Sequence, residues 1–394
     1  MKKPACITSV RVKNFKAIQD SGPVKLGPLT VFIGNNGSGK SSFIEALEAL
    51  QLIVQDDLDR AMLPWHGFEH AWNKASSHAD KAQSGNKRAH KANPMSFAFA
   101  GQGTTKQPGA FRARMDVTMG EGGNTLFIQR EKLTFSSGMR VERDDNGITR
   151  AINMPDFRDE RGLISDGRSI MQDLGLGGLG KWQFLLLNPQ TMGEPFPQTR
   201  AGSVRLAKDG RNVAEYLNWI RKQDISAFEG IVDAVQYVLP YASDIQPVLT
   251  SELERLVYLQ LTEQDYKIPG WLLSTGTLRI LALLALLRSP EPPPLLVVEE
   301  IENGLDPRAI GFLVDEIRSA ISYGDRQIII TTHSPYLLDK LALEHIVTVD
   351  RPDGGSPVFR RPDEEGELRQ WATKFAPGSL YSMGMLRSKE RRVR

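Results

Sequence analysis

The chain has 394 residues, 40% of them hydrophobic and 24% charged, which is the composition of an ordinary soluble globular protein. Its 49 Lys and Arg residues nearly balance its 47 Asp and Glu residues, so a net charge of +2 neither indicates nor excludes a nucleic-acid partner. The single cysteine, Cys6, excludes a disulfide framework and favours a reducing cytoplasm. The most apolar stretch, residues 278–287, is far shorter than the about 20 residues of a membrane-spanning helix, so we expect a cytoplasmic protein without a membrane segment.

The N-terminal segment predicts strands followed by a helix. Apolar and polar residues alternate through much of residues 7–33, and the run from Leu29 to Ile33 is typical of a buried strand. From Lys40 onward the apolar residues fall at helical spacing. We therefore expect a helix that packs on the preceding strand.

The middle of the chain predicts several smaller elements. Residues 73–94 are basic and lack an apolar period, which leaves two interpretations open: a solvated surface loop, or a contact with nucleic acid or a partner. Residues 97–149 predict an antiparallel meander. Residues 160–181 are Gly-rich and predict an irregular stretch, residues 184–187 a short strand and residues 188–210 a loop. Residues 212–240 predict two helices with a break near Ser226, and residues 255–261 predict a strand.

The last third of the chain alternates helices and strands. The expected helices are residues 277–288, 307–321 and 335–342, and the expected strands are residues 295–299, 327–331 and 345–349. This alternation is typical of a parallel sheet covered by helices.

A phosphate-binding motif lies between the first buried strand and the first long helix. It consists of Gly34, Asn35, Asn36, Gly37, Ser38, Gly39, Lys40 and Ser41, with Ser42 directly after it. Glycines allow backbone N–H groups to curl around phosphates at the N-terminus of a helix, where the helix dipole favours anions. We expect Lys40 to reach the β- and γ-phosphates and the Ser41 hydroxyl to bind Mg²⁺. The motif predicts a nucleoside triphosphate site.

Two carboxylates follow the apolar strand of residues 295–298. Glu299 and Glu300 lie where the carboxyl end of a parallel strand meets the ligand-binding edge of a sheet. Because neighbouring strand residues point in opposite directions, we expect the two to differ in role. Glu299 would hold Mg²⁺ or its water, and Glu300 would act as the general base on the attacking water.

The strand of residues 327–331 leads to His333. An imidazole at that position can donate a hydrogen bond to the γ-phosphate and contact the catalytic carboxylate. Alone it would more often be a structural histidine, but here it follows two other nucleotide-binding motifs in order.

The ordered motifs resemble those of ABC-type ATPases, and more narrowly the SMC/RecF/OLD-like AAA-family ATPases found in bacterial anti-phage defence systems. The resemblance begins with the phosphate-binding motif of residues 34–41, which is called the P-loop in these families. It continues with Leu273-Ser274-Thr275-Gly276-Thr277, then with Glu299-Glu300-Ile301-Glu302-Asn303-Gly304-Leu305-Asp306-Pro307, and ends with Thr332-His333-Ser334-Pro335. The opening Val10 to Ile18 also fits that branch.

The resemblance implies roles for further residues. Ser274 and Gly276 would be the signature motif, which contacts the γ-phosphate held by a second subunit, although Ser274 is also a plausible helix N-cap. Asp306 would be the D-loop residue, and Gln190 the Q-loop residue that assists Mg²⁺, with Gln183 as its competitor. Glu299 stands where the family more often has aspartate, and Ile301 where it usually has proline.

The resemblance also implies an α/β fold: an ABC-type P-loop NTPase head with a mixed or parallel sheet core, an antiparallel β-meander lobe and a helical lobe. We expect three segments. Residues 1–160 would form an N-terminal ATPase lobe with the P-loop, a basic insertion at about 55–94 and the meander. Residues 161–262 would form a connecting helical subdomain, and residues 263–394 a C-terminal ATPase lobe.

The resemblance implies an ATPase with ATP and Mg²⁺ as ligands and a head-to-tail homodimer as its active form. The favoured function is the ATPase or sensor subunit of an anti-phage defence system that controls a separate effector, a nuclease or toxin, because about 60 residues after His333 are too few for a nuclease domain. The alternative is a RecF-like DNA-binding ATPase in repair. DNA stays open as a partner, and the basic tail of residues 387–394 could contact nucleic acid, a protein partner or only solvent.

Overall fold

The computed structural model describes residues 5–74, 93–104, 109–120, 125–144, 149–153, 168–173, 179–199, 202–251, 254–352 and 355–387. The chain forms two compact units. Unit 1 comprises Met1–Trp182, Leu343–Gln370 and Gly384–Arg394, and unit 2 comprises Gln183–Ala342 and Trp371–Met383. This grouping differs from the three segments expected above, because the chain returns to unit 1 after residue 342. The three-segment division of the sequence stays a prediction.

Unit 1 contains an antiparallel sheet with the strand order β2-β1-β5-β6-β7-β8-β9, in which β3 also pairs with β1. Its strands are β1 (Cys6–Phe15), β2 (Ile18–Asp20), β3 (Val24–Lys25), β5 (Met95–Gln102), β6 (Ala110–Met119), β7 (Leu126–Phe135), β8 (Arg140–Arg143) and β9 (Thr149–Ile152). Strands β5 to β9 are each antiparallel to the next, which confirms the expected meander.

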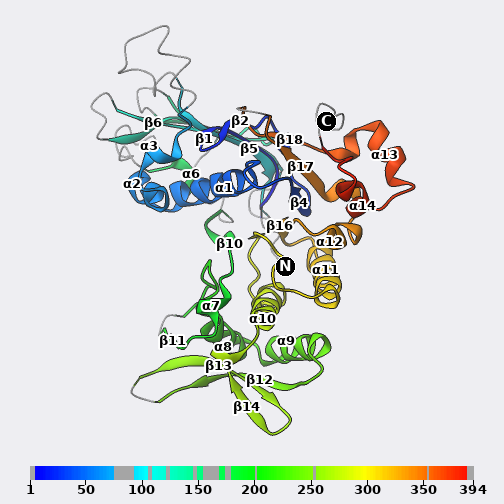
Figure 1. The fold of residues 1–394 in the computed structure, drawn as a ribbon. Helices are drawn as coiled ribbons and strands as arrows, with labels where there is room; N and C mark the ends of the chain where they lie inside the picture. Colours follow the sequence, from blue (N-terminus) through cyan, green and yellow to red (C-terminus); the bar gives the residue numbers. More distant parts are fainter. Residues whose placement is uncertain are drawn as a thin grey trace. The chain divides into compact units, whose positions relative to one another are not determined.

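One face of this sheet is buried and the other is polar, as the alternation in the sequence predicts. Val10 and Val12 on β1 and Phe97 and Phe99 on β5 are almost fully buried. Helix α1 (Lys40–Gln55) lies alongside the sheet in Figure 1 and, like the sheet, turns its apolar residues inward. Three shorter helices complete this side of unit 1: α2 (Leu58–Met62), α3 (Phe68–Ala71) and α6 (Ile170–Asp173).

A second set of strands in unit 1 carries the start of the nucleotide motif. Strand β4 (Leu29–Ile33), buried at every residue, lies parallel to β17 (Ile346–Asp350), and β18 (Val358–Arg360) is antiparallel to β17. Phe32 of β4 contacts Phe43 of α1 with ring centroids 5.2 Å apart. The strand–helix unit expected from residues 29–53 is confirmed.

Unit 2 contains three parallel strands whose carboxyl ends are in register. These are β10 (Gln183–Leu185), β15 (Leu295–Val298) and β16 (Gln327–Thr331), and Leu185, Val298 and Ile330 lie side by side. The neighbouring helices are α10 (Thr275–Leu287), α11 (Pro307–Ser322), α12 (Pro335–Asp339) and α14 (Pro377–Ser382). The helix and strand alternation of the last third is thereby confirmed. Along the sequence, helix α13 (Gly366–Ala372) contains the point after Gln370 at which the chain passes from unit 1 to unit 2.

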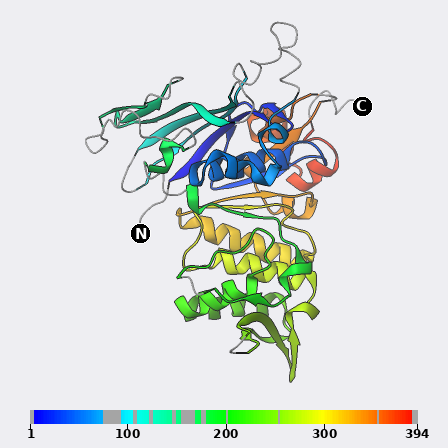
Figure 2. The same ribbon diagram turned by 90° about the vertical axis from the view of Figure 1, so that its left-hand side faces the viewer.

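The rest of unit 2 is helical with a small antiparallel sheet. Helices α7 (Pro189–Met192), α8 (Val213–Gln223) and α9 (Ile225–Val238) accompany β11 (Phe196–Pro197), β12 (Ala242–Leu249), β13 (Leu256–Glu263) and β14 (Tyr266–Pro269). In Figure 2 the green and yellow helices of unit 2 lie in layers above this sheet. Helices α8 and α9 match the expected pair, and the break falls at Asp224, which caps α9. Strands β12 and β14 and the short α7 were not expected.

No helix within the described part of the chain is long and apolar enough to cross a membrane. The basic loop of residues 73–94 and the Gly-rich stretch of residues 160–181 lie largely outside the described residues. The same holds for the basic tail after Arg387.

Candidate functional site

The P-loop connects β4 to α1 in unit 1, and its first position, Gly34, has no room for a side chain. Gly34 has φ 154°, and a Cβ there would lie 2.2 Å from the carbonyl oxygen of Val349 on β17. Such a distance excludes any side chain. Asn35, Asn36 and Gly37 are exposed, and the N–H of Ser38 donates to the Asn35 carbonyl at 3.1 Å, which closes the turn. Gly39, in the left-handed conformation, leads into α1.

The Lys40 side chain folds back over this turn. It is buried, and its Nζ donates to the carbonyl oxygens of Gly34 at 2.7 Å and Asn35 at 3.1 Å. The Ser38 hydroxyl is buried and has no hydrogen-bond partner among the residues that the structure describes. The first turn of α1 has no acidic residue. A positive charge, an unsatisfied hydroxyl and a helix N-terminus fit a polyphosphate. Ser41, exposed in the first turn of α1, has the hard oxygen that Mg²⁺ prefers, and Ser42 follows it.

The two expected carboxylates lie at the end of β15 in unit 2. Strand β15 ends at Val298, and Glu299 continues the ladder by donating its N–H to the Leu185 carbonyl of β10 at 3.0 Å. Glu299 is buried at 9% exposure, whereas Glu300 is exposed. The two side chains therefore differ in environment, because a turn begins after Glu299. The different roles expected of them stay predictions.

Glu300 adopts a backbone conformation that is uncommon for a residue with a Cβ. Its φ is 50°, and its N–H donates to the Thr331 hydroxyl of β16 at 2.8 Å. Its carboxylate accepts a hydrogen bond from the Asn303 amide at 2.5 Å. Backbone and carboxylate are thus held from two sides, which fixes the direction of this carboxylate. Strained residues held by their surroundings are common at functional sites.

His333 follows β16, and a carboxylate that the sequence analysis did not single out holds its backbone. The His333 N–H donates to one carboxylate oxygen of Glu302 at 2.6 Å. The other oxygen of Glu302 is buried, and no described residue forms a hydrogen bond with it. The sequence places Glu302 only two residues after Glu300, so its link to the end of a different strand could not be foreseen.

The signature motif begins helix α10. Ser274 is exposed, and its hydroxyl accepts from the Thr277 N–H at 3.1 Å, so it is the helix N-cap. A Cβ at Gly276 would lie 2.4 Å from the Gly304 carbonyl oxygen, so the turn after Glu300 packs directly on the signature. One turn further on, half-buried Arg279 donates to the Leu187 carbonyl at 2.9 Å. Burial lowers the pKa of the Arg279 guanidinium below its ordinary value, and the charges of Glu300 and Glu302 offset only part of that effect.

The remaining predicted residues have clear local roles. Asp306 is the N-cap of α11 and accepts from the N–H groups of Arg308 at 2.8 Å and Ala309 at 3.0 Å. Gln190 is exposed at the start of α7, where its N–H donates to the Asn188 side chain. Its competitor Gln183 is buried in β10 and donates to the Leu206 carbonyl at 2.7 Å. Gln183 therefore already has a structural role.

The described residues contain no group of three or more His, Cys, Asp or Glu side chains placed to hold a metal ion. In unit 2 the Glu300 N–H is bonded to Thr331 and the His333 N–H to Glu302. The signature helix packs on Gly304, and its Arg279 interacts electrostatically with Glu300 and Glu302. Unit 1 carries the complete P-loop.

Comparisons with known proteins agree with these motifs. The model of the family described as "AAA domain, putative AbiEii toxin, Type IV TA system" matches residues 67–339, more than half of the chain, and that of the family described as "AAA ATPase domain" matches residues 6–82. No curated protein matches the chain.

Solved structures of SMC heads share the fold. An SMC head bound to the C-winged helix domain of ScpA is 15% identical with a TM-score of 0.52, covering 94% of this chain and 99% of its own. An Smc head domain with an extended coiled coil, bound to the C-terminal domain of ScpA derived from Pyrococcus furiosus, is 13% identical with a TM-score of 0.51, covering 95% and 100%. The mixed α/β fold is therefore that of an ABC-type ATPase head. The chain belongs to the AAA-domain family whose model spans residues 67–339, and its fold is similar to that of SMC heads.

Proposed function

We propose that this protein binds ATP at its P-loop and hydrolyses it. The observation that carries the proposal is the P-loop itself: a loop that tolerates no side chain at Gly34 and folds around the buried ammonium of Lys40. That ammonium now donates to loop carbonyls, and phosphate oxygens would compete for it as stronger acceptors. Family membership in the AAA domains supports the same ligand.

The proposed hydrolysis uses the carboxylates of unit 2. Glu300 would take a proton from the attacking water, and its fixed backbone and its Asn303 contact keep the carboxylate in one direction. His333 would donate to the γ-phosphate. Mg²⁺, when bound, neutralises charge on the phosphates, and Ser41, Glu299 and Gln190 are the residues we propose to hold it or its waters.

The active form in this proposal is a head-to-tail homodimer. The exposed Ser274 and the neighbouring Gly276 would contact the γ-phosphate of ATP bound to the other subunit, with Asp306 near the interface. ATP would then favour the closed dimer and hydrolysis the open one, so that nucleotide contacts decide which state is populated.

We further propose that this switch serves anti-phage defence by controlling a separate effector protein. Support comes from the family description, which names a putative toxin of a toxin–antitoxin system, and from the ordered motifs of the SMC/RecF/OLD-like branch. The fold does not by itself define what the switch controls.

Glu300→Gln tests the chemical step. The amide keeps the size and the Asn303 contact but cannot act as a base, so we expect the hydrolysis rate to fall by about 10²-fold or more. ATP binding should persist, and the dimer should accumulate on size-exclusion chromatography with light scattering. Glu229→Gln, an exposed position on α9, is the matched control and should change neither.

Normal hydrolysis by Glu300→Gln would show that Glu300 is not the base. Failure of Lys40→Ala to reduce ATP binding would overturn the nucleotide site itself. Hydrolysis by a species that stays monomeric at saturating ATP would contradict the two-subunit mechanism.

A further inference from the structure

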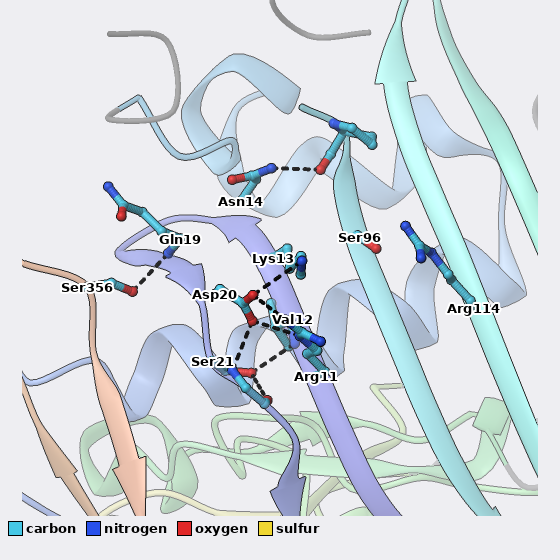
Figure 3. Close-up of polar contacts among 12 residues, drawn as sticks. Arg11, Val12, Lys13, Asn14, Gln19, Asp20, Ser21, Ser96, Arg114 and Ser356 are labelled. Atoms are coloured by element: carbon cyan, nitrogen blue, oxygen red, sulfur yellow. Dashed lines mark hydrogen bonds and ion pairs between the residues drawn. The ribbon is translucent and has the colours of Figure 1, made fainter. Parts of the chain in front are cut away.

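Two strands of unit 1, β17 and β18, form a hairpin that lies against both ends of the P-loop. Strand β17 contacts the start of the P-loop, where a backbone carbonyl of the strand leaves no room for a side chain. At the other end of the P-loop, a Cβ on Gly39 would lie 2.4 Å from Cγ of Pro357, just before β18. Next to Pro357, the Ser356 hydroxyl accepts a hydrogen bond from the Gln19 N–H at 3.0 Å, as Figure 3 shows. The hairpin and the P-loop therefore fix each other's position.

Arg360, the last residue of β18, connects this hairpin to two other segments of unit 1. Its guanidinium forms ion pairs with Asp350 at 2.7 Å and with Glu365 at 2.6 Å, and it donates to the Leu386 carbonyl at 3.3 Å. None of the three charged side chains is more than 26% exposed, so water and salt screen these pairs less than pairs on the open surface. Arg360 therefore holds Glu365 and Leu386 close to the end of β17.

Between Glu365 and Leu386 the chain leaves unit 1 and returns to it. Residues 371–383 belong to unit 2, whereas the residues directly before and after them belong to unit 1. We call residues 371–383 the strap. The segments on either side of the strap are thus held by one side chain, that of Arg360, and the Leu386 side chain is itself buried.

In unit 2 the strap packs against the helix that follows His333. Helix α14, which is part of the strap, lies beside α12 (Figure 1). The Asp339 carboxylate of α12 accepts hydrogen bonds from the N–H groups of Gly378 at 2.7 Å and Ser379 at 3.2 Å. A Cβ on Gly378 would lie 1.9 Å from the carbonyl oxygen of Pro335, so the two backbones touch at this point. Pro335 is the first residue of α12 and follows His333 by two positions.

Helix α12 needs such a partner because it is short. It has 5 residues, whereas isolated helices of fewer than about 12 residues are marginal in water. Packing against α14 therefore helps to keep α12 in place, and with it the loop that bears His333. The Glu302 carboxylate holds the start of the same loop.

We propose that the strap positions the His333 loop, with Arg360 holding the segments at its two ends and Asp339 attaching it to α12. The strap is a covalent link between the hairpin that contacts the P-loop and the helix that follows His333. A shift of the hairpin on nucleotide binding is therefore passed to His333. The effect on hydrolysis rests on the proposed function, whereas the effect on the stability of the loop can be measured without nucleotide. Arg360 and Asp339 are positioning residues, because both act through the strap.

The first test measures amide hydrogen exchange of the full chain by mass spectrometry, without nucleotide. Arg360→Gln removes both ion pairs, so we expect exchange to become about fivefold faster or more in the peptides that cover residues 331–339 and 371–383. The matched control, Arg361→Gln, removes the neighbouring ion pair with Asp363 and leaves the Arg360 contacts in place. In the control both peptides should exchange as in the unmodified chain. Unchanged exchange of residues 278–287 in α10 checks that each variant is folded.

Equal acceleration in Arg360→Gln and Arg361→Gln would overturn the role of Arg360. Unchanged exchange of residues 331–339 in Arg360→Gln would overturn the link to His333. Asp339→Ala gives the same measurement if Arg360→Gln does not fold, because it removes only the attachment at α12. Faster exchange of residues 331–339 is expected there too, and unchanged exchange would contradict the proposal.

The second test measures steady-state ATP hydrolysis. Asp339→Ala should lower kcat about tenfold and leave KM within about twofold, because the P-loop is untouched. Asp339→Asn keeps an acceptor oxygen for the two N–H groups and should retain kcat within about threefold. Equal losses in the two variants would overturn attachment through these hydrogen bonds. If the unmodified chain did not hydrolyse ATP, the proposed function would fail, and the exchange measurement would still decide whether the strap holds the loop.

Discussion

A single carboxylate, that of Glu302, links the ends of two strands in unit 2. One of its oxygens accepts the His333 N–H, and the other is buried beside the charge of Arg279. That second oxygen has no hydrogen-bond partner among the described residues, and a buried polar atom left without one is costly, which is more common where a side chain holds a site together. At the residue scale we interpret Glu302 as a positioning residue for the loop that bears His333.

Replacing Glu302 tests this interpretation. Glu302→Ala removes the acceptor of the His333 N–H, a charge-assisted hydrogen bond of about 1.5–3 kcal/mol, so we expect kcat to fall about tenfold or more. Glu302→Gln keeps an acceptor oxygen and should retain kcat within about threefold of the unmodified enzyme. KM should change little in either variant, since neither touches the P-loop. Steady-state hydrolysis assays measure both constants, and an equal loss in Gln and Ala variants would contradict positioning through this hydrogen bond.

At the scale of the element, helix α10 has two uses for its first residue. Ser274 caps the helix in the structure, and we propose that it also contacts ATP across the dimer. The N-terminus of a helix offers backbone N–H groups and a favourable dipole to an anion, so a residue placed there can serve both roles.

Two substitutions separate these roles. Ser274→Asp retains a capping side chain but places a negative charge where the γ-phosphate would lie, so we expect normal thermal stability and loss of the ATP-dependent dimer. Ser274→Ala loses the cap and should lower the free energy of unfolding by about 1 kcal/mol while leaving part of the dimer. Calorimetry and light scattering in the Glu300→Gln background distinguish them. If Ser274→Asp in the Glu300→Gln background formed the ATP-dependent dimer as efficiently as Glu300→Gln alone, the phosphate contact would be ruled out.

At the scale of the whole molecule, a head-to-tail dimer predicts complementation between inactive subunits. Lys40→Ala removes the P-loop cation and Ser274→Asp the signature contact, so each homodimer should be inactive. In a mixed dimer one site combines both defects and the other combines two intact halves.

Mixing equal amounts of the two variants should therefore restore hydrolysis to about a quarter of the unmodified rate, if half the dimers are mixed and each has one intact site of two. Lys40→Ala mixed with itself and Ser274→Asp mixed with itself are the controls. Absence of any recovery, with mixed dimers seen by native mass spectrometry, would indicate that each subunit completes its own site.

Local motifs made much of this protein predictable. The P-loop, the apolar strand before Glu299 and the strand before His333 are contiguous patterns, and the structure contains β4, β15 and β16 where they were expected. Strand β12 was missed because Pro247 argues against a strand. It lies at one edge of its sheet, in the order β11-β13-β12, where a missing N–H is tolerated. The roles assigned to Gln190 and the other site residues stay predictions.

The sequence by itself determined the nucleotide motifs, the fold class and the apolar faces of the elements, because each depends on spacing within a short segment. Only the tertiary structure decided which distant residues meet: Glu302 with His333, Gly276 with Gly304, and Gly34 with Val349. It also decided that the strap meets α12 at Asp339 and that Leu386 meets Arg360, because packing between distant segments, rather than spacing within one segment, sets which side chains become neighbours.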